Sequence, residues 1–156
     1  MTTRPDQRRL EAWEGLLRTH RALLRQLEQE LKEERDLPLP WYEVLLHLAR
    51  TPDGRLRMHE LAQSILLTPS GLTRLADRLE NAGLIRRESC PTDRRGAFAI
   101  LTLEGRTRLR HAAPVHLRGI DEHFGRYLSD DEAAQLARVF TRVLAALGED
   151  EEACSA

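Results

Sequence analysis

One stretch near the middle of the chain decides the fold: residues 68–101, which read TPSGLTRLADRLENAGLIRRESCPTDRRGAFAIL. Its first half predicts a compact helix. Thr68 is a good N-cap, Pro69 suits the first helical position, and Gly83 suits the left-handed residue that follows a helix. Between these ends the apolar residues recur at helical spacing. They are Leu72, Leu75, Ala76 and Leu79.

The second half of the stretch predicts a β-hairpin. Residues 84–89 and 97–101 have strand character, and residues 91–96 between them are polar and turn-forming. Upstream, the spacing of Met58, Leu61, Ala62 and Ile65 predicts a short helix. A short helix, a turn, a capped helix and a hairpin make a winged helix-turn-helix, in which the second helix enters the major groove of DNA.

Long helices are expected on both sides of this unit. Over about residues 8–34 the apolar positions step alternately by three and four, and this heptad seam is too long to bury on a small core. One explanation is that a partner chain covers the part of the seam that the core does not bury. The alternative is that the chain's own C-terminal helices cover it. A shorter helix is expected from Trp41, with Val44, Leu45 and Leu48 on one face.

The C-terminal part, about residues 103–148, predicts two more helices, with Thr102 and Ser129 as N-caps. The first of them is expected to bury Leu109, Ala113, Leu117, Ile120, Phe124, Tyr127 and Leu128. We therefore expect a mainly α fold, a single winged-helix domain over residues 1–148. Its DNA-binding part spans about 55–101, between N- and C-terminal dimerisation helices, and residues 149–156 form an acidic tail expected to be disordered.

Composition and charge fit such a fold. With 41% apolar residues among 156, the chain buries a core without disulfides or a metal. The net charge is only −1, but residues 55–110 carry 11 basic and 6 acidic groups, whereas residues 111–156 carry 4 and 9. This distribution indicates that a polyanion meets the middle of the chain.

The sequence lacks the residues that characterise several other classes of protein. No apolar run approaches the ~20 residues of a membrane span, and the first residues show no signal-peptide core, so we expect a cytoplasmic protein. Cys90 and Cys154 form neither a disulfide pattern nor a zinc pattern. The sequence has no Gly-rich phosphate loop, nucleophile elbow or HExxH motif, so we expect neither enzymatic activity nor a cofactor.

The helix over 69–81 carries residues suited to DNA on the face opposite its apolar stripe. Ser70, Gly71 and Thr73 are small residues near the helix N-terminus, where they allow close approach to phosphates and base edges. Arg74 and Arg78 are four residues apart and so point the same way, toward guanine or a flanking phosphate.

The turn of the hairpin carries a second group of such residues. Arg94 and Arg95 are placed to enter a minor groove. Asp93 is expected to orient a neighbouring arginine and to fix the wing against the helix. For each arginine taken alone, the alternative to a DNA contact is an ordinary charge on the solvated surface. Their joint placement on the two parts that touch DNA favours DNA binding.

At this level of detail the chain resembles the MarR family of bacterial transcriptional regulators. The resemblance rests on Leu61-Ala62, on residues 68–87 ending in LENAGLIRR, and on Asp93-Arg94-Arg95 followed by ILTLEG at 100–105. It implies a homodimer whose terminal helices form the interface and which binds a palindromic operator, often as a repressor. By position it implies these DNA contacts: Ser70, Thr73, Arg74 and Arg78 on the recognition helix, and Arg94 and Arg95 on the wing.

The resemblance also implies a small aromatic or phenolic effector, bound between the dimerisation helices and the winged part, that releases DNA. The candidate pocket residues are Trp13, His20, Trp41, Tyr42, His47 and His116. Core packing is the alternative for the aromatic residues, and a satisfied interface contact is the alternative for His20.

Cys90 immediately precedes the wing and is a candidate redox sensor, with an inert thiol as the alternative. No metal site is expected, because the histidines of the C-terminal part lack the i, i+4 spacing of a helical ligand pair. From another functional class, the alternative is a winged-helix module that binds proteins and does not read DNA.

Overall fold

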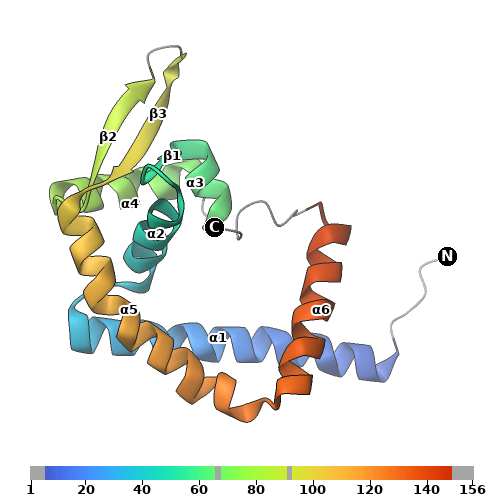
Figure 1. The fold of residues 1–156 in the computed structure, drawn as a ribbon. Helices are drawn as coiled ribbons and strands as arrows, with labels where there is room; N and C mark the ends of the chain where they lie inside the picture. The colour runs from blue at the N-terminus through green and yellow to red at the C-terminus, as the bar shows by residue number, and fades with distance from the viewer. Residues whose placement is uncertain (1–5, 66–67, 91–92, 149–156) are drawn as a thin grey trace.

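A computed structural model describes residues 6–65, 68–90 and 93–148 of the chain. Within these residues the protein is mainly helical, with one small antiparallel sheet, as expected (Figure 1). The elements in chain order are α1 (Gln7–Arg35), α2 (Leu39–Arg50), β1 (Arg55–Arg57), α3 (Met58–Ser64), α4 (Pro69–Asn81), β2 (Ile85–Cys90), β3 (Asp93–Leu101), α5 (Leu103–His123), η1 (Gly125–Tyr127, a 3-10 turn) and α6 (Asp130–Ala146).

The predicted helix caps are confirmed. The Thr68 hydroxyl accepts a hydrogen bond from the Gly71 N–H at 3.1 Å, and the Thr102 hydroxyl accepts one from the Gly105 N–H at 3.0 Å. Gly83 follows α4 with a φ of +73°, a left-handed conformation that glycine adopts without strain. At α6, Ser129 and Glu132 form a reciprocal capping box.

The three strands pair in the order β1-β3-β2, both pairs antiparallel. The hairpin was expected, but its predicted second strand was too short. β3 begins at Asp93 rather than at residue 97, because an irregularity between Ser89 and Cys90 shifts the register and lets Cys90 pair with Asp93. An irregularity of this kind lets the pairing of two strands continue into residues whose types predict a turn.

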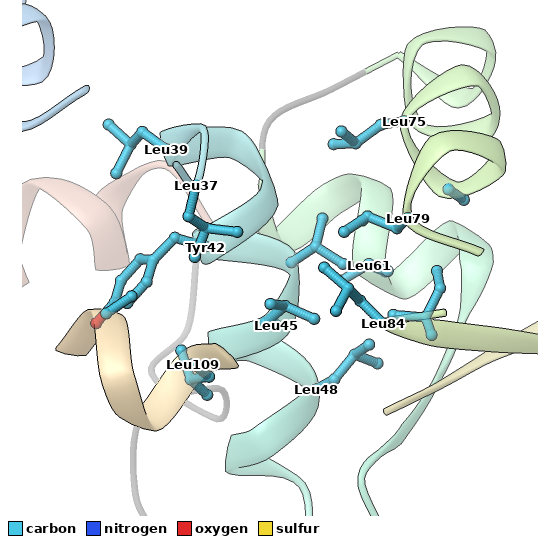
Figure 2. Packing of buried hydrophobic residues seen from close by; sticks show 14 of the residues in the cluster. Leu37, Leu39, Tyr42, Leu45, Leu48, Leu61, Leu75, Leu79, Leu84 and Leu109 are labelled. Carbon is cyan, nitrogen blue, oxygen red and sulfur yellow. The ribbon is translucent and has the colours of Figure 1, made fainter. Parts of the chain in front are cut away.

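The core lies where α2 is enclosed by α3, α4, α5 and the base of the sheet. Leucines from all of these helices converge there, and Figure 2 shows Leu45 and Leu48 of α2 between Leu61, Leu79, Leu84 and Leu109. Most of these side chains are fully buried. The winged unit is therefore built around one apolar cluster, which also contains Leu27 and Leu31 from the end of α1.

Two helical faces stay uncovered in the single chain. In α1 the predicted seam is buried only at its C-terminal end, while Trp13, Leu17 and Leu24 are exposed. α6 has no buried residue and exposes Val139, Phe140, Val143 and Leu144, and Leu147 immediately after the helix is exposed as well. Among the helices of the described residues, none is long and apolar enough to cross a membrane.

One part of the expected buried face of α5 is wrong for the single chain. Leu109 and Ala112 are buried, but Leu117 and Tyr127 are 62% and 73% exposed, and Ile120 is also exposed. The reason is that α5 leaves the winged core after its first half and then packs only against α1, which covers one side of it. The helical period alone does not reveal how far along a helix the cover extends.

Gly105 sits where α5 leaves the sheet and has no room for a side chain. A Cβ there would lie 2.0 Å from the Leu84 carbonyl oxygen, an atom that also accepts hydrogen bonds from Thr102. Gly105→Ala is therefore expected to lower the free energy of unfolding by about 1–3 kcal/mol, the cost of overpacking.

Gly15 is the matched control, because a Cβ there meets nothing within 4 Å and the position lies off the heptad seam. Gly15→Ala is expected to stabilise helix α1 by about 0.5–1 kcal/mol. Urea unfolding followed by circular dichroism measures both variants, and equal stabilities would contradict the packing described here.

Candidate nucleic-acid interface

Helix α4 divides into a buried face and an exposed face. Leu72, Leu75 and Leu79 are buried in the core, as predicted. Arg74 and Arg78 lie on the opposite, exposed side, and neither forms an ion pair with a described residue. Two guanidinium groups in this state are available to bind an anion.

The first turn of α4 places the three small residues predicted for DNA. Ser70 and Thr73 are exposed there. The Gly71 N–H is already used by the Thr68 cap, and a Cβ on Gly71 would lie 3.1 Å from that hydroxyl oxygen. The structure therefore explains Gly71 by the cap, and its contact with DNA stays a prediction.

A contact that the sequence reasoning missed joins the wing to α4. From β2, Arg87 forms ion pairs with Asp77 at 2.7 Å and with Glu80 at 2.6 Å. The Arg87 backbone N–H donates a further hydrogen bond to Glu80 at 2.8 Å. No periodic pattern connects residues 77, 80 and 87, since a helix end and a turn lie between them, so only the fold reveals this cluster.

Electrostatics within this cluster are mutually favourable. Hydrogen bonds from the Arg87 side chain and backbone hold the pKa of Glu80 below its usual value, and the Glu80 carboxylate raises the pKa of Arg87. The cluster is half-exposed, so its free energy is modest. Its geometric effect is larger, because a fork of charge-assisted hydrogen bonds fixes β2 relative to α4.

Wing residues predicted to contact DNA lie only partly within the structure. The backbone of β3 begins at Asp93, so Asp93, Arg94 and Arg95 belong to the hairpin, but their side chains lie outside the described residues. The Cys90 side chain lies outside them as well. The expected role of Asp93 in fixing the wing stays a prediction, whereas Arg87 makes such a connection directly.

The predicted effector residues are only partly brought together. The rings of Tyr42 on α2 and His116 on α5 lie 4.4 Å apart, at the junction of the winged core with the long helices. Burial raises the pKa of Tyr42 and lowers the pKa of His116. The His116 Nδ1 atom is buried and has no hydrogen-bond partner.

The other four candidates lie in different surroundings. Trp13 and His20 are exposed on α1, and Trp41 packs partly against the core. His47 is half-buried on α2, and burial lowers its pKa. Among the described residues, no group of three His, Cys, Asp or Glu side chains is arranged to hold a metal ion.

The described fold is that of a winged helix-turn-helix protein, with α3 and α4 as the two helices and β2–β3 as the wing (Figure 1). Its exposed arginines lie on the helix that reads DNA in such proteins. This is the general class that fold and site define.

Comparison with known proteins gives the family. The model of the MarR family matches residues 35–96. The transcriptional regulator HosA from Escherichia coli O111:H- is 36% identical over 97 residues, which are 62% of this chain and 70% of HosA. Crystal structures of AbsC and Sco3205, two MarR family transcriptional regulators from Streptomyces coelicolor, are each 33% identical, with a TM-score of 0.84. Each similarity covers 96% of this chain, together with 100% of AbsC and 96% of Sco3205, which was solved in complex with DNA.

The chain belongs to the MarR family, and it is a DNA-binding transcriptional regulator. The resemblance predicted from the sequence is thereby confirmed. The membership decides against the alternative of a winged-helix module that binds only proteins.

The Arg87 cluster predicts a specific pH dependence of stability. Because the folded-state pKa of Glu80 is depressed, its contribution is fully present above the usual value of 4.5 and is lost as the pH falls through the lower, folded value. Wild-type protein is therefore expected to lose more stability below pH 4.5 than Glu80→Gln, which has no carboxylate to protonate. Urea unfolding from pH 6 to pH 3 measures this, and parallel curves for the two proteins would contradict it.

Proposed function

We propose that the protein is a homodimeric repressor that binds a palindromic operator and releases it when a small aromatic or phenolic effector binds. The exposed apolar faces of α1 and α6 are the observation that carries the dimer. A soluble monomer rarely leaves so many large apolar side chains uncovered along two helices. A second copy of the chain covers them in the proposed assembly.

Dimer symmetry leads to the operator. A two-fold dimer presents two identical α4 helices, so the DNA it binds best is a palindrome with half-sites about 34 Å apart, one turn of B-DNA. Repression follows when such a site overlaps a promoter, because the bound dimer occupies DNA that the polymerase needs.

Within each half-site the contacts are proposed to divide by groove. Ser70, Thr73, Arg74 and Arg78 of α4 contact the major groove, where arginine binds guanine through two hydrogen bonds. Arg94 and Arg95 of the wing enter the flanking minor groove. The Arg87 cluster supports this division, since it holds wing and helix as one reading unit.

The effector site is proposed at the Tyr42–His116 contact. This contact joins α2 of the winged core to α5, so a molecule inserted there changes the angle between the DNA-reading unit and the dimerisation helices. An aromatic molecule with a hydroxyl or carboxylate group suits it, because the Tyr42 ring offers stacking and the buried His116 Nδ1 atom lacks a hydrogen-bond partner.

The division of grooves predicts two kinds of variant. Arg74→Ala or Arg78→Ala is expected to lose about 1–3 kcal/mol of discrimination between the preferred base and others at one position of each half-site. Arg94→Ala is expected to weaken binding to all sequences and to lower the slope of log affinity against log salt by about 1 per contact. Selection of bound sequences, followed by binding titrations at several salt concentrations, tests this prediction. If the three variants had the same base preferences and the same salt slope, the proposed division between the grooves would be wrong.

The dimer prediction concerns α6. Val143→Asp places a charge in the exposed apolar face and is expected to shift the protein from dimer to monomer at micromolar concentration, because a buried unpaired charge is costly. Gln135→Asp adds the same charge on the same helix, outside that apolar set, and is expected to leave the dimer intact. Analytical ultracentrifugation measures both, and a wild-type monomer would refute the assembly.

A gel shift with the DNA upstream of the coding region tests the proposed function directly. A discrete complex of two chains per site that resists competitor DNA is expected. Exclusively non-specific binding, at that site and in a genome-wide selection of bound fragments, would contradict the operator proposal.

A further inference from the structure

Two arginines on the outer face of the sheet are stacked on one aromatic ring. Arg57 of β1 is directly opposite Phe98 of β3, and Arg55 lies two residues earlier on the same face. The guanidinium carbon of Arg55 lies 3.8 Å from the centre of the Phe98 ring, and that of Arg57 lies 5.2 Å from it. The other face of these strands, with Leu56 and Ala99, packs on the core. We call Arg55, Arg57 and Phe98 the outer-sheet patch.

The patch holds positive charge without a counter-ion among the described residues. Neither Arg55 nor Arg57 forms an ion pair there, and the Arg55 Nε atom is buried without a hydrogen-bond partner. Like charges gathered in this way favour an anion, and the aromatic stack holds the forks in place for it.

Neighbouring arginines of β2 show the contrast. Arg86, on the same outer face, is paired with Glu88, and Arg87, on the inner face, is paired with Asp77 and Glu80. Their charges are therefore satisfied within the protein. The arginines of the outer-sheet patch have no such partner among the described residues, so β1 places two uncompensated charges beside Phe98 of β3, on the side of the sheet away from α4.

We propose that the outer-sheet patch binds DNA backbone phosphates that flank the operator, beyond the point reached by the wing. DNA is favoured over an acidic protein segment because the chain is a DNA-binding regulator and β3 is shared by the wing and the patch. A duplex that bends toward the protein past the wing brings its flanks to this face. The inference rests on the proposed operator binding and extends its footprint.

The test compares two duplexes that contain the same operator, one ending just beyond the wing contacts and one extended by about one helical turn, ~10 bp, on each side. Wild-type protein is expected to bind the long duplex more tightly, with a slope of log affinity against log salt steeper by about 3.6, because four arginines per dimer contact phosphates and each contact contributes about 0.9. The double variant Arg55→Ala with Arg57→Ala is expected to bind the long duplex no better than the short one, and the short one as wild type does.

Two further variants separate a local effect from a general one. Arg110→Ala removes one exposed positive charge from α5, outside the sheet, and is expected to keep the length dependence. Phe98→Leu keeps an apolar side chain but removes the stacking ring, and is expected to reduce the length dependence partly. Melting temperatures of all variants, and their unchanged binding to the short duplex, show that the fold is intact.

The outcomes distinguish this inference from the proposed function. If wild-type protein binds both duplexes specifically but equally well, the operator proposal stands and the flanking contact is wrong, which would assign the patch to an acidic protein partner. If the double variant loses affinity equally for both lengths, the arginines act within the operator and the flanking contact is again wrong. If wild-type protein binds neither duplex specifically, the operator proposal itself fails.

Discussion

The geometry of DNA reading depends on one interaction, the fork of hydrogen bonds and ion pairs from Arg87 on β2 to Asp77 and Glu80 on α4. A two-stranded hairpin is marginally stable by itself, and in the sheet of the described residues β2 pairs with β3 alone. Arg87 connects β2 to α4, so the wing and the recognition helix are held in one relative position, and the groove contacts proposed above would keep a constant spacing along the DNA. The same fork pairs the Asp77 carboxylate with a cation, so its negative charge is compensated within the protein.

Helix α5 connects the winged unit to α1, one of the two helices proposed to form the dimer interface. Its first turn packs so closely under Leu84 that Gly105 has no space for a side chain. Its second half binds α1 through a Glu34–Arg118 ion pair and a Glu30–His123 hydrogen bond, and Gly119 permits that close approach. Because α5 is one helix between these two contacts, it connects the packing on α1 directly to the base of the wing. The contact between Tyr42 of α2 and His116 lies along the same helix, between its two ends, which is where we propose that an effector acts.

The fold was largely predictable because its signals are local. Thr68, Gly83 and Thr102 mark helix ends by backbone chemistry that needs no tertiary context, and the apolar stripe of α4 follows from its period. What failed or was missed depends on contacts between distant segments. Arg87 contacts Asp77 and Glu80 only because the turn after α4 brings β2 back beside that helix. Leu117 and Tyr127 are exposed because α5 extends beyond the helices that cover its first half. Trp13 is exposed near the N-terminal end of α1, whereas Tyr42 is buried on α2. Helical spacing was enough to predict that Arg74 and Arg78 are exposed. The contact of Arg55 and Arg57 with the Phe98 ring could not be predicted in this way, because it depends on the register between β1 and β3.

Operator binding by Arg87→Ala, with Arg86→Ala as its control, tests the central claim most directly. Arg86 precedes Arg87 on the same strand and points to the opposite face, where it pairs with Glu88. Arg87→Ala is expected to lose up to about tenfold in operator affinity, which corresponds to about 1.4 kcal/mol, because the wing is no longer held against α4. Arg86→Ala is expected to bind within about threefold of wild type, as surface ion pairs contribute little. If Arg87→Ala instead bound the operator as tightly and as selectively as wild type, the wing would not depend on this connection to the recognition helix.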